Sequence, residues 1–172
     1  MTGSLEDFLT NMRSISVLEI PKKKVPELSS SISCDKLFSC FFDYDSPVII
    51  IKDEKGKFLG LLTPKNFLKL FNPVHSDLRD PFFQALYFEN ATADEIVDKK
   101  LPIVYDDLKL EDVAELMLKY STNVLPRAKD RKSEVEGVIL FIDILNFVKD
   151  KWLEYKEQND GSLSCEGDIL NE

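Results

Sequence analysis

Apolar residues in this chain fall into strand-like and helix-like runs, and one arrangement of these runs occurs twice. Segments 47–71 and 126–148 each combine an extended segment, a charged turn, a second extended segment with a glycine, and a helix. The glycine of the first copy, Gly60, recurs 77 positions later as Gly137. Two copies of one supersecondary unit predict a pseudo-symmetric pair with a shared interface, which is a natural place for a ligand cleft.

The spacing of apolar, turn and capping residues predicts the order strand, helix, strand, strand, helix in each half. The first half is expected to contain a strand near 17–20, a helix over 35–43, strands between 47 and 62 around a turn at 53–56, and a helix from 63 to about 71. The second half is expected to contain a short helix over 92–98, a strand at 103–105, a helix over 111–120, strands over 123–128 and 135–140, and a helix over 142–158. A short amphipathic helix over 4–12, with Ser4 and Asp7 as a capping box, is expected to pack on the two halves.

These elements divide the chain into five segments. They are an N-terminal helix (1–14), a first repeat (15–72), a connector (73–91), a second repeat (92–158) and an acidic tail (159–172) that is expected to be disordered. The connector lies between helical segments and is expected to contain one aromatic-rich helix at 82–88. The predicted fold class is α+β, with two β-α-β-β-α repeats packed sheet to sheet about a pseudo-twofold axis.

Composition narrows the classes of partner and compartment. The formal net charge is −9, and a field of that sign repels polyanions, so neither nucleic acid nor an anionic membrane is expected as a partner. No apolar run approaches the ~20 residues that span a bilayer, and the N-terminus lacks the features of a signal peptide. The odd set of Cys34, Cys40 and Cys165 does not suggest a disulfide framework. A cytoplasmic location is expected.

Residues that would indicate catalysis are sparse. The single histidine, His75, lies in the connector with no serine or cysteine nucleophile pattern around it. No cluster of cysteine and histidine has metal-ligand spacing, and no glycine-rich phosphate loop ending in Lys-Ser/Thr is present. We therefore expect a protein that is not an enzyme and holds neither a metal nor a cofactor.

The duplicated motifs resemble those of the cystathionine β-synthase (CBS) domain, which occurs as tandem pairs called Bateman modules. The first copy shows Pro47-Val48, the turn Asp53 to Gly56, and Gly60-Leu-Leu-Thr63-Pro-Lys-Asn66. The second shows Leu125-Pro126, Asp130, and Gly137-Val-Ile-Leu140-Phe-Ile-Asp143. The resemblance covers roughly residues 15 to 150, and the segment 93–126 also matches the first half of a CBS repeat. It implies the α+β tandem fold described above.

The resemblance also implies where a ligand would bind. In the Gly-x-x-Thr/Ser-x-x-Asp pattern, the aspartate accepts hydrogen bonds from ribose hydroxyls, while the Thr/Ser and the amides at the helix start face a phosphate. This chain has Thr63 and Asn66 in the first copy, and Asp143 with Leu140 in place of threonine in the second. A helix N-terminus does favour anions, and a carboxylate suits neighbouring hydroxyls. Each residue also has a purely structural interpretation, since Thr63 and Asn66 can cap a helix and Asp143 can favour its dipole.

Four further residues are candidate ligand contacts. By the resemblance, Ile103 and Val104 of the second repeat flank the base. Arg127 replaces an apolar residue and is expected either to meet a phosphate or to reach water from a strand edge. Lys65 lies at the head of a helix, where its charge opposes the dipole and a nearby anion would relieve the conflict.

Two functions remain open at the sequence level. The first is a regulatory sensor that binds AMP, ADP or ATP in the cleft between the repeats and relays binding to an unidentified regulated protein. S-adenosylmethionine is a further candidate because it shares the adenosine group. The alternative is a ligand-free dimerisation and interaction scaffold, which the losses at Asn66 and Leu140 would fit. The resemblance implies a homodimer, with helix faces near Phe67, Leu68 and Phe147 as contact surfaces.

Overall fold

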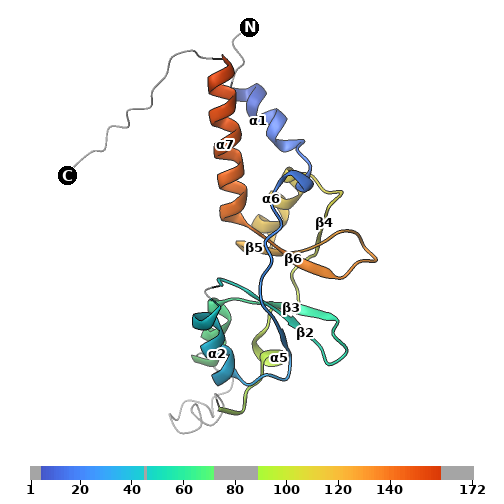
Figure 1. Cartoon of the computed structure of the whole chain (residues 1–172), viewed down its shortest axis with the longest axis vertical. Helices are drawn as coiled ribbons and strands as arrows, with labels where there is room; N and C mark the ends of the chain where they lie inside the picture. Colours follow the sequence, from blue (N-terminus) through green and yellow to red (C-terminus); the bar gives the residue numbers. More distant parts are fainter. Residues whose placement is uncertain (1–4, 45, 72–88, 160–172) are drawn as a thin grey trace, which may run out of the picture.

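The computed structural model describes residues 5–44, 46–71 and 89–159, and Figure 1 shows two lobes stacked along the long axis of the molecule. The first lobe contains β1 (Glu27–Ser29), α2 (Cys34–Asp43), β2 (Ile49–Lys52), β3 (Phe58–Leu62), a 3₁₀ turn (Pro64–Phe67) and α3 (Leu68–Phe71). The second lobe contains β4 (Val104–Tyr105), α6 (Leu110–Lys119), β5 (Val124–Ala128), β6 (Val135–Leu140) and α7 (Phe141–Asn159). Three further elements begin the two sequence repeats: α1 (Leu5–Arg13) and a 3₁₀ turn (Val17–Glu19) come before β1, and α5 (Ala93–Ile96) comes before β4. The order strand, helix, strand, strand, helix is therefore present in both halves, but the first strand of the first half is β1 and not the segment 17–20 that was expected to form it.

The two sheets have the same topology. In the first, β1 pairs in parallel with β2, which pairs antiparallel with β3; β4, β5 and β6 repeat this arrangement. Both hairpin turns are closed by an aspartate, since Asp53 Oδ1 accepts from the amides of Lys55 and Lys57, and Asp130 Oδ1 from those of Lys132 and Ser133. Asx turns of this kind satisfy the backbone locally.

The central strands β2 and β5 are buried along nearly their whole length, which explains their uninterrupted apolar character. Ile49 and Ile51 face the helices of the first lobe, whereas Ile50 joins Val48 in an apolar cluster between the two sheets. From the second lobe, Val138 and Leu140 enter the same cluster. The predicted packing of sheet against sheet is therefore confirmed, and the cluster between the sheets holds the lobes together.

Each lobe is completed by a segment from the start of the other sequence repeat. Residues 15–23 lie on the second lobe: Val17 N donates to Leu108 O at 3.0 Å, and Lys23 pairs with Val138 of β6. Residues 91–98 lie on the first lobe in the equivalent way, with Ala93 N donating to Ile32 O at 2.9 Å and Asp98 pairing with Leu61. The two repeats therefore interlock, so neither folding lobe coincides with one sequence repeat.

Some expectations need correction. The segment 17–20, expected as a strand, forms a 3₁₀ turn that begins where the Ser16 hydroxyl accepts from Leu18 N at 3.2 Å. This turn places Val17 and Ile20 together in the core of the second lobe. The helix expected over 92–98 ends at Ile96, because the chain must extend to pair at Asp98. Ser4, the connector helix at 82–88 and the acidic tail lie outside the described residues.

Two aromatic clusters fix the helices on the lobes. Phe67, expected on an exposed helix face, is instead buried, with its ring 5.7 Å from Phe38 and 5.6 Å from Phe41. At the far end of the molecule α1 lies beside α7 (Figure 1). Phe8 of α1 packs edge-on against Trp152 of α7, with ring centroids 4.8 Å apart. The N-terminal helix therefore packs on the second lobe, as its amphipathic pattern predicts.

Candidate functional site

The first corner, where β3 enters the 3₁₀ turn at Thr63–Asn66, is closed by its own side chains. Asn66 Oδ1 accepts hydrogen bonds from the Thr63 amide at 2.7 Å and from the Thr63 hydroxyl at 2.8 Å. Asn66 Nδ2 donates to the carbonyl oxygen of Ile96 at 2.9 Å, and the Asn66 residue is only 7% exposed. The first corner thus forms the capping arrangement predicted from the sequence, and it also holds α5 of the other repeat.

A lysine reinforces this contact. Lys69 Nζ donates to Ile96 O at 2.6 Å and approaches Val97 O at 3.4 Å, both at the C-terminal end of α5. A cation at a helix C-terminus satisfies orphan carbonyls and complements the dipole. Desolvation lowers the pKa of Lys69 below its usual value, although the carboxylate of Asp98 opposes this. The Ile96 carbonyl is therefore bound by two side chains from the first lobe.

The second corner, where β6 enters α7 at Leu140–Asp143, has a different character. Asp143 Oδ2 is buried and has no hydrogen-bond partner among the described residues. Leu140 occupies the position of Thr63 and is buried in the cluster between the sheets, so it offers no hydroxyl here. The amide of Phe141 donates to Asn123 O at 2.9 Å, which anchors the start of α7 to the residue that precedes β5. The second corner therefore contains a buried carboxylate oxygen that is unsatisfied by the described residues.

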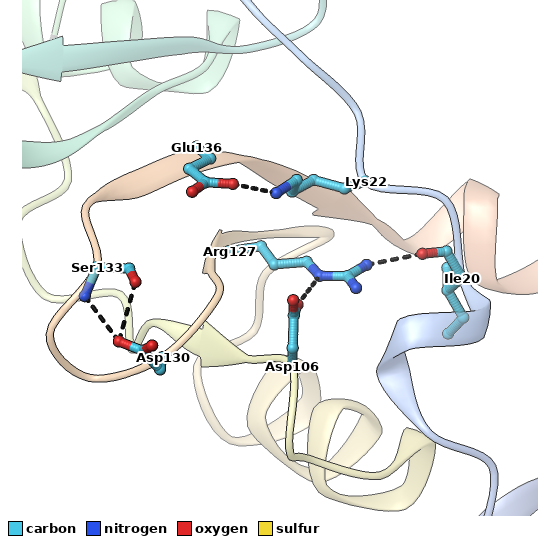
Figure 2. Close-up of polar contacts among 7 residues, drawn as sticks. All are labelled: Ile20, Lys22, Asp106, Arg127, Asp130, Ser133 and Glu136. Atoms are coloured by element: carbon cyan, nitrogen blue, oxygen red, sulfur yellow. Dashed lines mark hydrogen bonds and ion pairs between the residues drawn. The ribbon is translucent and has the colours of Figure 1, made fainter.

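Figure 2 shows that Arg127 of β5 links the second lobe to the N-terminal segment. Its Nε donates to Asp106 Oδ1 at 2.8 Å, its Nη1 donates to Ile20 O at 2.7 Å, and the residue is only 3% exposed. The expectation that Arg127 reaches water from a strand edge is therefore wrong, because Asp106 and the Ile20 carbonyl hold the guanidinium inside the lobe. A second link lies nearby, where Lys22 forms an ion pair with Glu136 of β6.

The remaining candidates are distributed across three environments. Val104 is fully buried in the core of the second lobe, so its side chain is unavailable to a ligand. Ile103 is half-buried and packs against the cluster between the sheets. Lys65 is exposed at the first corner. The structure thus brings Thr63, Lys65 and Asn66 together at the first corner and pairs Val104 with Arg127 on adjacent strands. Asp143 lies apart from both groups, in the first turn of α7.

Sequence analysis missed the contacts that hold the two exchanged segments, residues 15–23 on the second lobe and residues 91–98 on the first. The carbonyls of Ile20 and Ile96 accept the side-chain hydrogen bonds described above, and a backbone carbonyl leaves no trace in side-chain identity. The usable signal was the repeat itself, because Ile20 and Ile96 are 76 positions apart. Asp106, the partner of Arg127, gave no signal at all in the sequence.

Comparisons with known proteins identify this architecture. The family model described as "CBS domain" matches residues 93–150. No relative was found among curated proteins. A conserved CBS domain protein from Thermoplasma acidophilum has a TM-score of 0.63 at 17% identity, and the match covers 83% of this chain and 76% of that chain. The fold is a tandem CBS pair. The resemblance to a Bateman module inferred from the two motifs is therefore confirmed.

Two solved structures similar to this pair are described in complex with adenosine compounds. The CBS domain pair of protein MJ0100, in complex with 5′-methylthioadenosine and S-adenosyl-L-methionine, has a TM-score of 0.59 at 23% identity, and the match covers 77% of this chain and 98% of that chain. The cytosolic domain of the Mg²⁺ channel MgtE, in complex with ATP, has a TM-score of 0.52 at 20% identity, and the match covers 71% of this chain and 44% of that chain. At these identities the structural similarity shows the fold alone. The ligand of this CBS pair must be inferred from its own residues.

Within the described residues, no group of three or more histidine, cysteine, aspartate or glutamate side chains is placed to hold a metal ion. No helix in the described part of the chain is long and apolar enough to cross a membrane.

Proposed function

We propose that this CBS pair is a regulatory module that binds an adenosine nucleotide, AMP, ADP or ATP, at the interface of its two repeats and relays binding to a partner protein. The observation that carries the proposal is the buried Oδ2 of Asp143, which lacks a hydrogen-bond partner in the described residues. A buried acceptor without a donor is costly, so such atoms are rarely left unsatisfied. Two neighbouring ribose hydroxyls would supply the missing donors.

The location of Asp143 suits a relay. It lies in the first turn of α7, and the same helix contacts α1 through Trp152 and Tyr155 near its other end. A ligand that favours one arrangement of this helix relative to the first lobe would change the surface that α1 and α7 present. No chemical change in the ligand is required, so the proposal describes a binding module rather than an enzyme.

Thermal melting with AMP, ADP, ATP and S-adenosylmethionine tests the proposal directly. A ligand present at one hundred times its dissociation constant stabilises the folded state by about 2.7 kcal/mol. We expect at least one adenine compound to raise Tm, and the increase to shrink in Asp143→Asn. Asp150→Asn is the matched control, since Asp150 is an exposed aspartate further along the same helix. If none of the four compounds changes Tm, the proposal is wrong.

A second function has its own supporting observation. The first corner is satisfied without any ligand, and the first lobe exposes large apolar side chains, with Phe42 at 73% and Leu68 at 61% exposure. These features fit a ligand-free scaffold that forms a homodimer or holds another protein. Sedimentation velocity of the wild type and of a Phe42→Ser, Leu68→Ser variant tests this alternative. A dimer that the double substitution dissociates would support it, and a monomer at all concentrations would argue against self-association.

A further inference from the structure

We propose that this CBS pair binds one ligand per chain, at the second corner only, because side chains that hold the interlocked segments close the first corner and free the second. The inference rests on the proposed function and specifies its stoichiometry and location. It follows from a comparison of two pairs of equivalent positions, Ile20 with Ile96 and Asn66 with Asp143.

The equivalence of these positions is fixed by backbone pairing. One backbone bridge joins Ser16 to Lys109, and another joins Thr92 to Ser33. Thr92 follows Ser16 by 76 positions, and Lys109 follows Ser33 by the same number. The bridges of Lys23 to Val138 and of Asp98 to Leu61 are also equivalent, because each joins the entering segment to the residue after the repeated glycine, although their offsets are 75 and 77 positions. Ile20 and Ile96 therefore enter the two lobes in the same way. Their carbonyl oxygens both point to a side-chain donor of the lobe they complete.

In the first lobe, the corner residue itself serves as this donor. Asn66 Nδ2 in the side chain donates to Ile96 O, and Asn66 Oδ1 accepts from both the backbone amide and the hydroxyl of Thr63. Both polar atoms of the side chain are therefore engaged inside the protein. A ligand hydroxyl at this position would have to displace Thr63 or release Ile96, and either exchange gives up an existing hydrogen bond for each one gained. The first corner therefore has a structural role, because Asn66 joins Thr63 to Ile96 of the other repeat.

In the second lobe, an aspartate occupies the corner, and a carboxylate has no proton to donate to a carbonyl. Arg127 provides the donor instead, from β5, through Nη1 to Ile20 O. Because Arg127 performs the function that Asn66 performs in the first lobe, Asp143 is not needed to hold the N-terminal segment. Its Oδ2 remains buried and unpartnered within the described residues. Arg127 is thus a positioning residue that leaves Asp143 available to a ligand.

The backbones of the two corners are therefore related by the pseudo-twofold symmetry, but the side chains at equivalent positions differ in their hydrogen-bonding groups. At the second corner a hydroxyl-bearing ligand meets a carboxylate oxygen that has no partner within the described part of the chain, and at the first corner it meets a side-chain amide that is already hydrogen-bonded. A charge-assisted hydrogen bond is also stronger than a neutral one, which increases the difference between the corners. The consequence is a stoichiometry of one where two equivalent corners would give two.

Isothermal titration calorimetry of the wild type with AMP, ADP, ATP and S-adenosylmethionine tests the stoichiometry. For whichever of these four compounds binds, we expect one site per chain. Asp143→Asn should weaken binding roughly tenfold or more, because a neutral acceptor replaces a charged one. Asn66→Ala should lower Tm but leave the dissociation constant within about twofold, measured at a temperature where circular dichroism confirms folding.

A measurement without substitutions guards against an unfolded variant. In a ¹H–¹⁵N spectrum of the wild type, ligand should shift the amide signals of 141–144 and leave those of 63–66 unchanged. Two sites per chain, or shifts of equal size at both corners, would overturn the single-site inference while the proposed function stands. The absence of binding by all four compounds would overturn both the single-site inference and the proposed function. Binding that Asn66→Ala removes but Asp143→Asn retains would place the ligand at the first corner and contradict the single-site inference.

Discussion

Gly60 of β3 lies against the backbone carbonyl of Asp98, where the start of the second repeat crosses the first lobe. A Cβ at Gly60 would be 2.9 Å from the carbonyl carbon of Asp98 and closer still to its oxygen. The backbones of Leu61 and Asp98 exchange two hydrogen bonds at this point, with N–O distances of 3.2 and 3.0 Å. Gly137 has the same relationship to Lys23, whose oxygen would be 2.6 Å from a Cβ. The repeated glycine is therefore required by the interlocking of the repeats.

This close approach predicts that Gly60→Ala separates the exchanged segment from the first lobe. The added Cβ meets backbone rather than a movable side chain, so we expect a loss of about 3 kcal/mol or more in the free energy of unfolding. Urea denaturation measures it. The control is Gly56→Ala at the hairpin turn, where φ is +78° and nothing lies within 4 Å of an added Cβ. Only the left-handed backbone is unfavourable there, at about 1 kcal/mol. Equal losses in the two variants would contradict the packing argument.

Replacement of Arg127 by methionine is expected to be strongly destabilising. It leaves the Asp106 carboxylate without its buried partner and the Ile20 carbonyl without a donor. Removal of one member of a buried pair costs about 3–5 kcal/mol. Chemical denaturation of Arg127→Met, Asp106→Asn and the double variant would give the coupling energy. Lys151→Met, which breaks the exposed pair with Glu154, should cost less than about 1 kcal/mol. A similar small effect at Arg127 would show that the N-terminal segment is held by other contacts.

The stability of the fold should decline at alkaline pH through Cys34. Burial raises the pKa of its thiol from 9.0 to about 11, with smaller contributions from Glu95 and Asp35. The folded state therefore holds this proton more tightly than the unfolded state, so its contribution is complete below pH 9 and is lost as pH rises towards about 11. Two pKa units correspond to roughly 2–3 kcal/mol. Unfolding free energies of wild type and Cys34→Ala, measured from pH 8 to 11, should converge. Parallel curves would contradict the assignment to Cys34.

The N-terminal helix should detach when its one buried side chain is removed. Phe8 is the only residue of α1 buried in the body of the protein, and it packs against Trp152 and Tyr155. At nine residues, α1 is shorter than the ~12–15 residues that an isolated helix needs, so its helicity depends on this contact. In Phe8→Ala we expect fast amide exchange over 5–13. The emission of Trp152, the single tryptophan, should shift to the red.

The control for this experiment is Leu9→Ala on the exposed side of the same helix. It should leave both the exchange pattern and the emission unchanged. Protection of α1 in the Phe8→Ala variant would show that the helix is held by contacts other than this aromatic cluster.

Much of the fold could be predicted from the sequence because its signals are local. Capping residues such as Thr63 and Thr92 mark helix starts, and both capping arrangements are present. Apolar runs and Asx turns fixed the two hairpins to within one or two residues of their observed bounds. Val17–Ile20 was assigned wrongly because four apolar-rich residues fit a strand as well as a turn, and only contact with the second lobe selects the turn.

The candidate site could be located in sequence but not evaluated there. Thr63, Asn66 and Asp143 stand at equivalent corners of the repeat, and spacing alone was enough to find them. Whether each side chain is free depends on the atoms around it. Arg127 illustrates the difficulty, because a strand arginine next to Pro126 gives no sign that Asp106 and Ile20, 21 and 107 positions away, enclose its guanidinium.

The sequence by itself determined the duplicated unit, the order of its elements and the two corners, since these follow from periodicity, turn chemistry and the repeat of about 77 positions. Only the tertiary structure decided that each lobe is completed by the other repeat, and that the Asn66 amide is hydrogen-bonded at one corner whereas Asp143 Oδ2 at the other has no partner among the described residues. The physical reason is that hydrogen-bond satisfaction depends on which donors and acceptors meet in space. Backbone carbonyls such as those of Ile20 and Ile96 take part in these contacts without any mark in the sequence.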